Sequence, residues 1–333
     1  MRIGIIGVGR IGALHAETLR SLAEVDELTV VDTDRTRARQ VASTMGVPWA
    51  EDSEHLLHGG VDGVVIATPT DTHAPLICAA AEAGAAVFCE KPLARDLAGT
   101  KEVVRLVEKS GARVQVGFQR RFDAGFASAR AQVQAEKLGW LHTVRASTFD
   151  PAPPPAAYVG SSGGIFRDCS VHDIDAVRWV TGREVSTVYA TGSNRGASYF
   201  DQAGDVDTAA AVLTLDDGTL ALISAARYNA AGYDVRLELL GAADSISVGL
   251  DDRSPLRSAE PGVTWPAGTA YAGFLDRFRA AYVAELKAFV EMVGGRAASP
   301  CPPADALETF YVAEACELSR RERRPVSMEE VRL

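Results

Sequence analysis

The first third of the chain alternates short apolar runs with segments whose apolar residues recur at helical spacing. Continuous apolar runs of strand length occupy residues 2–6, 28–31, 63–67, 86–89 and 113–116. Helical spacing follows the first run through Ile11, Leu14, Leu19 and Leu22, and it recurs over residues 35–45, 74–83 and 96–109. Repeated strand–helix–strand units predict a parallel, doubly wound sheet of the Rossmann type.

The pattern changes after Gly117. A helical segment over 123–138 and a strand over 141–148 are followed by the prolines of 150–155, which predict a stiff loop, and by a helix around Asp168 that ends at Gly182. Alternating patterns then predict strands at 185–192, 208–215, 219–228, 235–240 and 245–248, before helices at 274–293 and 304–321. We therefore expect an α/β Rossmann domain over residues 1–118 and an α+β domain over residues 119–333, built on a large, mostly antiparallel sheet.

A glycine-rich turn joins the first predicted strand to the first predicted helix. Its residues are Gly7, Val8, Gly9, Arg10, Ile11 and Gly12. In this context, Gly7 makes the tight turn, Gly9 lets the backbone approach a pyrophosphate, and Gly12 allows close packing of helix on strand. Amide groups at the start of the helix would face the phosphates, so an anionic dinucleotide is the expected ligand.

Asp32 ends the second predicted strand, twenty residues after Gly12. A carboxylate at this position accepts hydrogen bonds from the adenosine ribose and repels a 2′-phosphate, which favours NAD over NADP. Arg35 could soften that preference by placing a cation near the same ribose. The alternative is that Asp32 merely caps the following helix.

Polar residues also follow the later strands, at the edge where ligands of parallel sheets bind. They form three groups: Thr68, Pro69, Thr70 and His73; Glu90, Lys91 and Pro92; and Gln119, Arg120 and Arg121. All three groups are expected to border the cofactor. Lys91 is the strongest functional candidate among them, because Pro92 restricts the backbone of Lys91 and ends the strand.

The segment from Gly163 to Asp175 contains the other reactive side chains. If it is helical, at about 100° per residue, Asp168, His172 and Asp175 share one stripe of the helix. Three interpretations compete for Asp168 and His172: a metal site, a general acid/base pair, or two groups that satisfy one another in a core. A buried, structural role is favoured for the neighbouring Cys169 over a reactive thiol.

Composition narrows the class of protein. The chain has 333 residues, 47% hydrophobic and 23% charged, which is typical of a globular protein with room for two domains. Its net charge of -10 disfavours nucleic acid as a partner. It shows neither a leader peptide nor a long apolar run, so no membrane partner is expected, and five cysteines without a C-x-x-C pair suit reduced thiols of the cytoplasm.

On these residues the chain resembles the glucose-fructose oxidoreductase/inositol dehydrogenase (Gfo/Idh/MocA) family, and within it the myo-inositol 2-dehydrogenases. The match spans nearly the whole chain. The resemblance rests on the glycine turn, Val87–Leu93 with Glu-Lys-Pro, Gln115–Asp123, the proline loop 150–155, and Gly164–Asp168 with Val171–Asp173. One departure is Phe149, where inositol enzymes of this kind often carry a polar or basic residue.

The resemblance implies roles for named residues. Lys91, Asp168 and His172 would be catalytic, and Asp32 would bind the ribose. Tyr233 would form a wall of the substrate pocket, and Gln119, Arg121 and Asp150 would join the catalytic residues in binding the substrate. Members of the family assemble through the open face of the second sheet, so a homotetramer is expected.

For oxidation of a secondary alcohol, these roles form a consistent scheme. His172 would remove the hydroxyl proton, Asp168 would orient the imidazole and stabilise its charged form, and Lys91 would offset charge on the developing alkoxide. Because Lys91 fills the charged role and no third ligand cluster is present, the metal interpretation weakens.

The expected activity is NAD-dependent oxidation of a cyclic polyol, myo-inositol to its 2-keto product. Two alternatives remain. One is a pyranose sugar dehydrogenase of the same family, which Phe149 keeps open. The other is a non-catalytic, dinucleotide-sensing regulatory protein.

Overall fold

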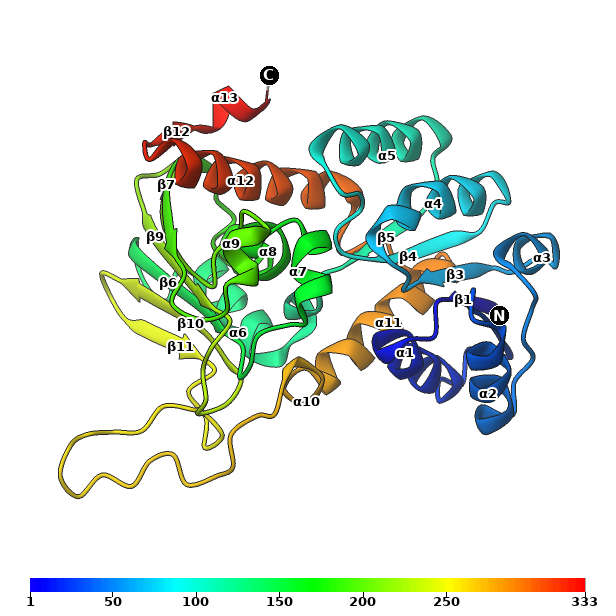
Figure 1. The fold of residues 1–333 in the computed structure, drawn as a ribbon, viewed down its shortest axis with the longest axis horizontal. Helices are drawn as coiled ribbons and strands as arrows, with labels where there is room; N and C mark the ends of the chain where they lie inside the picture. The colour runs from blue at the N-terminus through cyan, green and yellow to red at the C-terminus, as the bar shows by residue number, and fades with distance from the viewer. Residues whose placement is uncertain (333) are drawn as a thin grey trace. The chain divides into compact units, whose positions relative to one another are not determined.

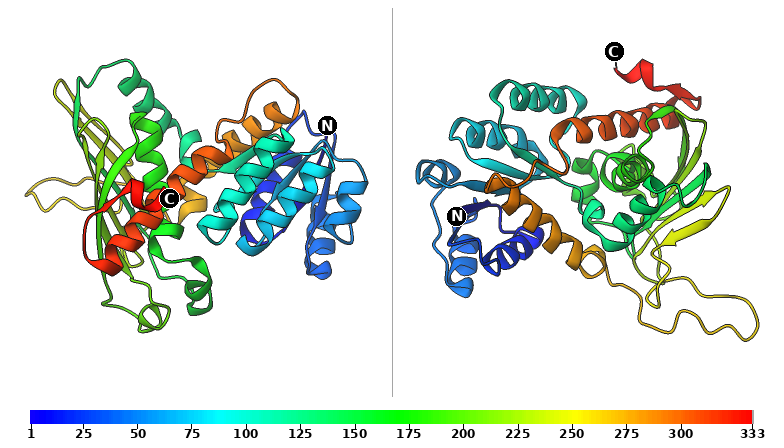
Figure 2. Two further views of the ribbon diagram at one scale, coloured as in Figure 1. Left: turned by 90° about the horizontal axis from the view of Figure 1, so that it is seen from above. Right: turned by 180° about the vertical axis from the view of Figure 1, so that it is seen from behind.

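The computed structural model describes residues 1–332, and its contacts divide the chain into two compact units. The first unit comprises Met1–Gln119 together with Ala280–Glu308, and the second comprises Arg120–Arg279 and the chain from Thr309 onward. Figures 1 and 2 show the course of the chain through both. The sequence placed one boundary, between residues 118 and 119. Residues 280–308 instead return to the first unit.

The first unit is built on a five-stranded sheet in the order β2-β1-β3-β4-β5, with every pair parallel. Its strands are β1 (Arg2–Ile6), β2 (Glu27–Val31), β3 (Gly63–Ile66), β4 (Ala86–Glu90) and β5 (Val114–Gly117). Nearly all their side chains are buried, as expected for a sheet covered on both faces. The predicted Rossmann-type sheet is confirmed.

Helices cover both faces of this sheet. Figure 1 shows α4 (His73–Glu82) and α5 (Leu97–Ser110) on one side, and α1 (Arg10–Arg20) and α2 (Arg35–Met45) on the other. The short elements α3 (Ser53–His58) and η1 (Thr70–Thr72) were not predicted, because so few residues show no clear period.

Helix α11 (Arg279–Val293) explains why a distant segment joins the first unit. Its residues Leu286, Phe289 and Val290 pack in one apolar cluster with Ile3 and Ile5 of β1. Gly63 at the start of β3 makes room for them. A Cβ atom at Gly63 would lie 2.7 Å from the side chain of Val293 and 3.0 Å from that of Phe289.

The second unit is built on a seven-stranded sheet in the order β11-β10-β6-β9-β8-β7-β12. Its strands are β6 (Leu141–Phe149), β7 (Val185–Ser193), β8 (Thr208–Leu215), β9 (Leu220–Ala226), β10 (Asp234–Gly241), β11 (Ser245–Val248) and β12 (Val326–Ser327). All neighbours are antiparallel except β6 and β9, which are parallel. The predicted, mostly antiparallel sheet is confirmed.

Within this unit, the longer helices α6 (Ala124–Gln134), α8 (Val171–Thr181) and α12 (Pro303–Glu322) lie on one face of the sheet, as Figure 2 shows. Burial therefore alternates along β8, where Ala209, Ala211 and Leu213 are buried and Ala210 and Val212 are exposed. Up to residue 332, no helix of the unit covers the opposite face in Figure 2.

Several short elements depart from the sequence prediction. Helix α7 (Ala156–Ser162) follows the proline loop directly and was not predicted. The predicted helix over 274–293 is interrupted at Phe278 into α10 (Phe274–Arg277) and α11. The other additions are η2 (Gln119–Phe122), η3 (Phe166–Ser170), α9 (Tyr199–Gln202) and α13 (Met328–Arg332). Among residues 1–332, no helix combines the length and the apolar character needed to cross a membrane.

Candidate active site

The glycine turn between β1 and α1 has the shape that a bound pyrophosphate needs. Gly7 has φ +90°, and a Cβ atom there would lie 2.6 Å from the carbonyl oxygen of Ala67. A Cβ atom at Gly12 would lie 1.9 Å from the carbonyl oxygen of Gly7, so only glycine fits. At Gly9, by contrast, nothing lies within 4 Å of the added atom. The open space is therefore at the start of α1, where helix amides attract an anion.

Asp32 organises this turn from the end of β2. Its Oδ2 accepts a hydrogen bond of 2.9 Å from the amide of Val8, and its Oδ1 accepts one of 2.9 Å from the amide of Asp34. The cap of α2 is Asp34, whose side chain accepts from the amides of Thr36 and Arg37. The alternative interpretation of Asp32 as the helix cap is therefore wrong.

An arginine does lie beside Asp32, although it is not the one the sequence singled out. Arg37 Nη1 lies 3.3 Å from Asp32 Oδ2. Arg35 instead points to Glu51, with 3.6 Å between Arg35 Nη1 and Glu51 Oε1. Since α2 begins at Arg35, a two-residue step along the helix turns the side chain to a different side.

His73 ties together two of the loops that follow the strands. Its Nε2 lies 2.9 Å from the carbonyl oxygen of Thr68, and its Nδ1 lies 2.7 Å from that of Pro92. The ring is 1% exposed. Its position favours a role in shaping the loops that carry Thr68, Pro69 and Lys91 over direct contact with the cofactor.

Glu90 and Lys91 end strand β4. Glu90 Oε1 lies 2.7 Å from Nε2 of His15, which is fully buried on α1. Lys91 follows with a half-buried side chain and a cis peptide bond to Pro92. Glu90 is thus held by the first unit's core, while Lys91 extends from the carboxyl end of the sheet.

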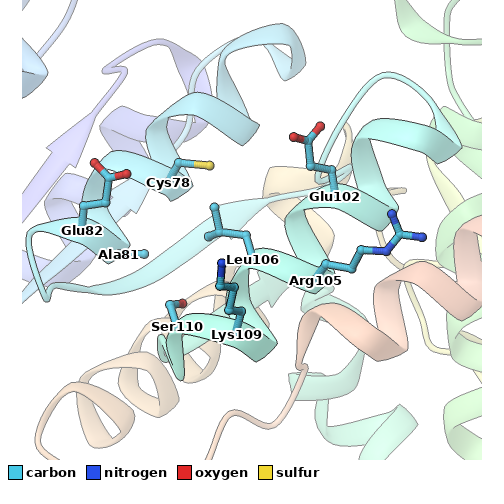
Figure 3. Close-up of a pocket in the computed structure, with 8 residues that line it drawn as sticks. All are labelled: Cys78, Ala81, Glu82, Glu102, Arg105, Leu106, Lys109 and Ser110. Carbon is cyan, nitrogen blue, oxygen red and sulfur yellow. The ribbon is translucent and has the colours of Figure 1, made fainter.

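A separate hollow of about 470 Å³ lies between α4 and α5, and Figure 3 shows the residues that line it. Cys78 and Glu82 come from α4, and Arg105 and Lys109 come from α5. These residues lie in the helix halves that lead into β4 and β5, toward the amino ends of the strands. The hollow is therefore at the edge opposite to the one where Rossmann sheets bind dinucleotides.

In the second unit, Asp168 and His172 lie on successive turns, but not on one regular α-helix. Residues Phe166–Ser170 form a π-helical turn, and α8 begins only at Val171. The expected spacing of 100° per residue is therefore wrong through Asp168. Asp175 is buried within the unit and bound to Arg121, so it does not join them as a reactive group. Asp168 and His172 are both half-buried, and π-turns of this kind occur frequently at functional sites.

Asp168 is held by two residues that sequence reasoning missed. Its Oδ2 accepts a hydrogen bond of 2.7 Å from Nη2 of Arg227, and its Oδ1 accepts one of 2.8 Å from the hydroxyl of Tyr158. The same guanidinium donates from Nη1 to Oδ2 of Asp150 over 2.9 Å. Asp150 and Asp168, both named as substrate ligands from the sequence, are thus joined by one buried arginine.

The arginines after β5 are occupied inside the second unit. Arg120 Nη1 donates to Asp173 over 2.6 Å, and Arg121 binds Asp175 through two hydrogen bonds of 2.6 and 3.0 Å. All four side chains are at most 4% exposed. Burial works against the charge on Arg120, but its neighbours, Asp173 first among them, together outweigh burial and raise the pKa of Arg120. These contacts favour a structural role for both arginines.

The remaining candidates are buried. Gln119 is 4% exposed and Tyr233 is 6% exposed, and burial raises the pKa of the Tyr233 phenol. Burial also raises the pKa of the Cys169 thiol, against the opposing effect of Arg227. A thiol with a raised pKa carries little thiolate, which agrees with a structural Cys169. Among residues 1–332, no three His, Cys, Asp or Glu side chains cluster as metal ligands would.

Comparisons with known proteins agree with this geometry. Residues 1–118 match the model of an oxidoreductase family with an NAD-binding Rossmann fold, and residues 126–247 match the model of the GFO/IDH/MocA C-terminal domain. The chain is 36% identical to a myo-inositol 2-dehydrogenase of Thermotoga maritima, with 99% of each chain covered. It is 35% identical to a scyllo-inositol 2-dehydrogenase (NAD(+)) of Bacillus subtilis, covering 99% of this chain and 96% of the relative.

A solved structure is similar along the whole chain. The scyllo-inositol dehydrogenase of Lactobacillus casei, solved with bound NAD(H) and scyllo-inositol, superposes with a TM-score of 0.88 at 29% identity and covers 99% of each chain. The two family models and the full-length relatives indicate the same family of oxidoreductases. The chain belongs to the GFO/IDH/MocA family of oxidoreductases and is an NAD-dependent dehydrogenase.

Proposed function

We propose that this enzyme oxidises a secondary hydroxyl of a cyclic polyol with NAD, and that its substrate is myo-inositol, converted to 2-keto-myo-inositol. The observation that carries the proposal is the half-buried pair Asp168 and His172, in a chain that matches inositol dehydrogenases over nearly its full length. Because the relatives are named dehydrogenases, a non-catalytic sensing role has no support.

In the proposed mechanism, His172 Nε2 or Nδ1 takes the proton of the substrate hydroxyl as the C–H bond breaks. Asp168 orients the imidazole and stabilises the positive charge that it acquires. Lys91 donates a hydrogen bond to the same oxygen, which lowers the free energy of the developing alkoxide. NAD, held by the glycine turn and Asp32, supplies the hydride acceptor when bound.

The same proposal gives contacts with the substrate to Gln119, Asp150 and Tyr233. Arg121, also expected from the sequence to bind the substrate, is bound to buried Asp175 and keeps the structural role. Asp150 has one oxygen on Arg227, and a carboxylate can accept further hydrogen bonds from polyol hydroxyls. Arg121 is less suited to a test by substitution, because its loss would also leave the buried carboxylate of Asp175 without this partner.

A substrate panel tests the proposed activity. Myo-inositol, scyllo-inositol and other inositols, together with glucose-type aldoses, are incubated with enzyme and NAD, and NADH is followed at about 340 nm. We expect myo-inositol to give the highest kcat/KM. Faster turnover of aldoses would favour the second candidate, a pyranose dehydrogenase. Phe149 beside Asp150 supports this candidate, because inositol enzymes of this kind often carry a polar or basic residue there. No NADH from any polyol or sugar would exclude both.

Asp32→Ala is expected to weaken the preference for NAD. The substitution removes a carboxylate that a 2′-phosphate would meet, while Arg37 remains nearby to attract it. Like-charge juxtaposition costs several kcal/mol, so the ratio of kcat/KM for NADP to that for NAD should rise by about tenfold or more. An unchanged ratio would contradict the role given to Asp32.

We also propose a homotetramer that uses the bare face of the second sheet. Tyr189, Val212 and Leu222 are neighbours across β7, β8 and β9, and they are 45%, 41% and 41% exposed on that face. Leu220 adds a further side chain that is 44% exposed. A contiguous apolar row of this kind is typical of a protein interface.

Leu222→Asp is expected to dissociate the tetramer into smaller species, because it would bury a carboxylate in an apolar contact. Light scattering after size-exclusion chromatography measures the mass directly. Leu256→Asp is a matched control, since Leu256 is 40% exposed outside the sheet. A wild-type monomer, or an unchanged Leu222→Asp tetramer, would exclude this face as the interface.

Reduced thiols support placing the enzyme in the cytoplasm. Cys78, Cys89, Cys169 and Cys316 are free thiols, and all of these except Cys78 are buried. Free cysteines are typical of proteins kept in a reducing compartment.

A further inference from the structure

The parallel pairing of β6 with β9 places an arginine beside the candidate catalytic carboxylate. Phe149 is in register with Ala226, so the residues that follow them, Asp150 and Arg227, leave the sheet side by side. The amide of Asp150 donates to the carbonyl of Ala226 over 2.9 Å, and that of Arg227 donates to the carbonyl of Asp207 over 2.8 Å. The peptide group that joins Ala226 to Arg227 is thus held on both sides.

The guanidinium of Arg227 spans two carboxylates that lie far apart in the sequence. Nη1 reaches Asp150 over 2.9 Å and Nη2 reaches Asp168 over 2.7 Å, while the arginine side chain is 7% exposed. Two charge-assisted hydrogen bonds in this geometry fix a side chain more firmly than one. Asp168, on the π-helical turn, is therefore tied to the end of the sheet.

We propose that Arg227 is a positioning residue for the reaction, which holds Asp168 ionised and in one orientation so that His172 alone serves as the base. The inference rests on the proposed function. An ionised Asp168 can stabilise an imidazolium, whereas a protonated one cannot and would compete as a proton carrier.

The charged and titratable groups around Arg227 and Asp168 fit this role. Burial opposes the charge on Arg227, but neighbouring groups, among them the carboxylates of Asp168 and Asp150, favour it, and the pKa of the guanidinium is raised. The Cys169 thiol is kept neutral by burial. Tyr158 donates to the Asp168 oxygen that Arg227 leaves open. One cation thus serves two carboxylates, and its loss would remove a directly bonded positive charge from both.

A buried arginine on the neighbouring helix offers a matched control. Arg178 on α8 also has a side chain that is 7% exposed. It binds Glu184 through two hydrogen bonds of 2.7 Å and Thr309 through a third. Its carboxylate partner is not among the proposed catalytic residues, so Arg178→Met reports the structural cost of losing such an arginine.

The test compares Arg227→Met, Arg227→Lys and Arg178→Met with wild type in the pH dependence of kcat/KM for myo-inositol. Loss of a neighbouring cation raises the pKa of a carboxyl group by about one to three units. Removing the cation would raise the pKa of Asp168 and also that of His172, which sets the acid side of the profile, so the acid side of the Arg227→Met profile should move up by about one unit. We expect kcat to fall about tenfold or more, with a smaller change in KM.

The other two variants separate charge from structure. Arg227→Lys keeps the charge but cannot bridge two carboxylates as the planar guanidinium does. The acid side of its pH profile should therefore match that of wild type, while its kcat should lie between those of Arg227→Met and wild type. Arg178→Met should lower the melting temperature and leave the profile in place. If Arg227→Met only lowers the melting temperature and keeps the wild-type profile, the proposed role is wrong.

A second measurement needs no turnover, so that failure of the proposed substrate can be told apart from failure of this inference. Diethylpyrocarbonate modifies neutral imidazole, and peptide mass spectrometry follows its addition to His172 as a function of pH. In Arg227→Met, the midpoint for His172 should move to higher pH, because a nearby positive charge has been removed. An unchanged midpoint would overturn the inference, whichever substrate the enzyme uses.

Discussion

His172→Ala is expected to lower kcat for myo-inositol by about 100- to 10,000-fold, the range that loss of a general base produces. His172 lies at the start of α8, is half-buried, and follows the π-helical turn that carries Asp168. Because the imidazole accepts the proton in the transition state of the chemical step, KM should change much less than kcat. Steady-state rates over a range of pH measure both, and the fall in wild-type activity at low pH should be absent from the variant.

A control and a rescue make this result specific. His58→Ala removes an exposed histidine at the end of α3 and should leave kcat within about twofold of wild type, as expected for a surface substitution. Added imidazole should restore part of the activity of His172→Ala, because it can occupy the vacated volume and accept the proton. Turnover that survives in His172→Ala would favour the interpretation of His172 and Asp168 as a core pair.

Asp173→Asn is expected to destabilise the second unit by about 3–5 kcal/mol, the cost of breaking a buried ion pair from one side. Asp173 accepts a hydrogen bond of 2.6 Å from Arg120 and one of 2.8 Å from Thr148, and Arg120 also donates to Thr148 over 2.7 Å. The side chains of Arg120 and Asp173 are 3% and 0% exposed. Water therefore cannot solvate the Arg120 guanidinium once it has lost the carboxylate of Asp173. Urea unfolding gives the change in the free energy of unfolding.

An exposed pair provides the comparison. Arg253 and Asp276 are joined over 2.6 Å, yet their side chains are 40% and 37% exposed. Solvent screens such pairs, so Asp276→Asn should cost less than about 1 kcal/mol. Equal effects of Asp173→Asn and Asp276→Asn would show that the buried network contributes no more than a surface contact.

Much of the first unit could be predicted from the sequence because its signals are local. The glycine turn, the apolar strands and the helical periods each lie within a few consecutive residues, and helix α2 is found at the predicted residues 35–45. The return of α11 to this unit could not be predicted. A helical period shows that a face will be buried but not which sheet will bury it, and only the packing of Phe289 and Val290 against Ile3 decides that.

The candidate site divides along the same line. Lys91, Asp168 and His172 were named from local motifs and a family resemblance, and their roles stay predictions until turnover is measured. Arg227 was missed because it lies 59 residues from Asp168, and the only path to it was the parallel pairing of β6 with β9. A meander predicts antiparallel neighbours, so nothing in the pattern of residues placed Arg227 beside Asp150. Arg37 was missed for a different reason, because the direction of a side chain depends on where α2 begins.

Transfer of an isotope from a defined carbon tests the central claim most directly. Myo-inositol with deuterium at C2 is incubated with wild-type enzyme and NAD, and both products are examined by mass spectrometry. If the enzyme removes hydride from C2, the reduced cofactor will carry the deuterium. The ketone product will be 2-keto-myo-inositol and will carry no deuterium. Unlabelled NADH would place the oxidation at another carbon, and the absence of NADH would contradict the proposed reaction as a whole.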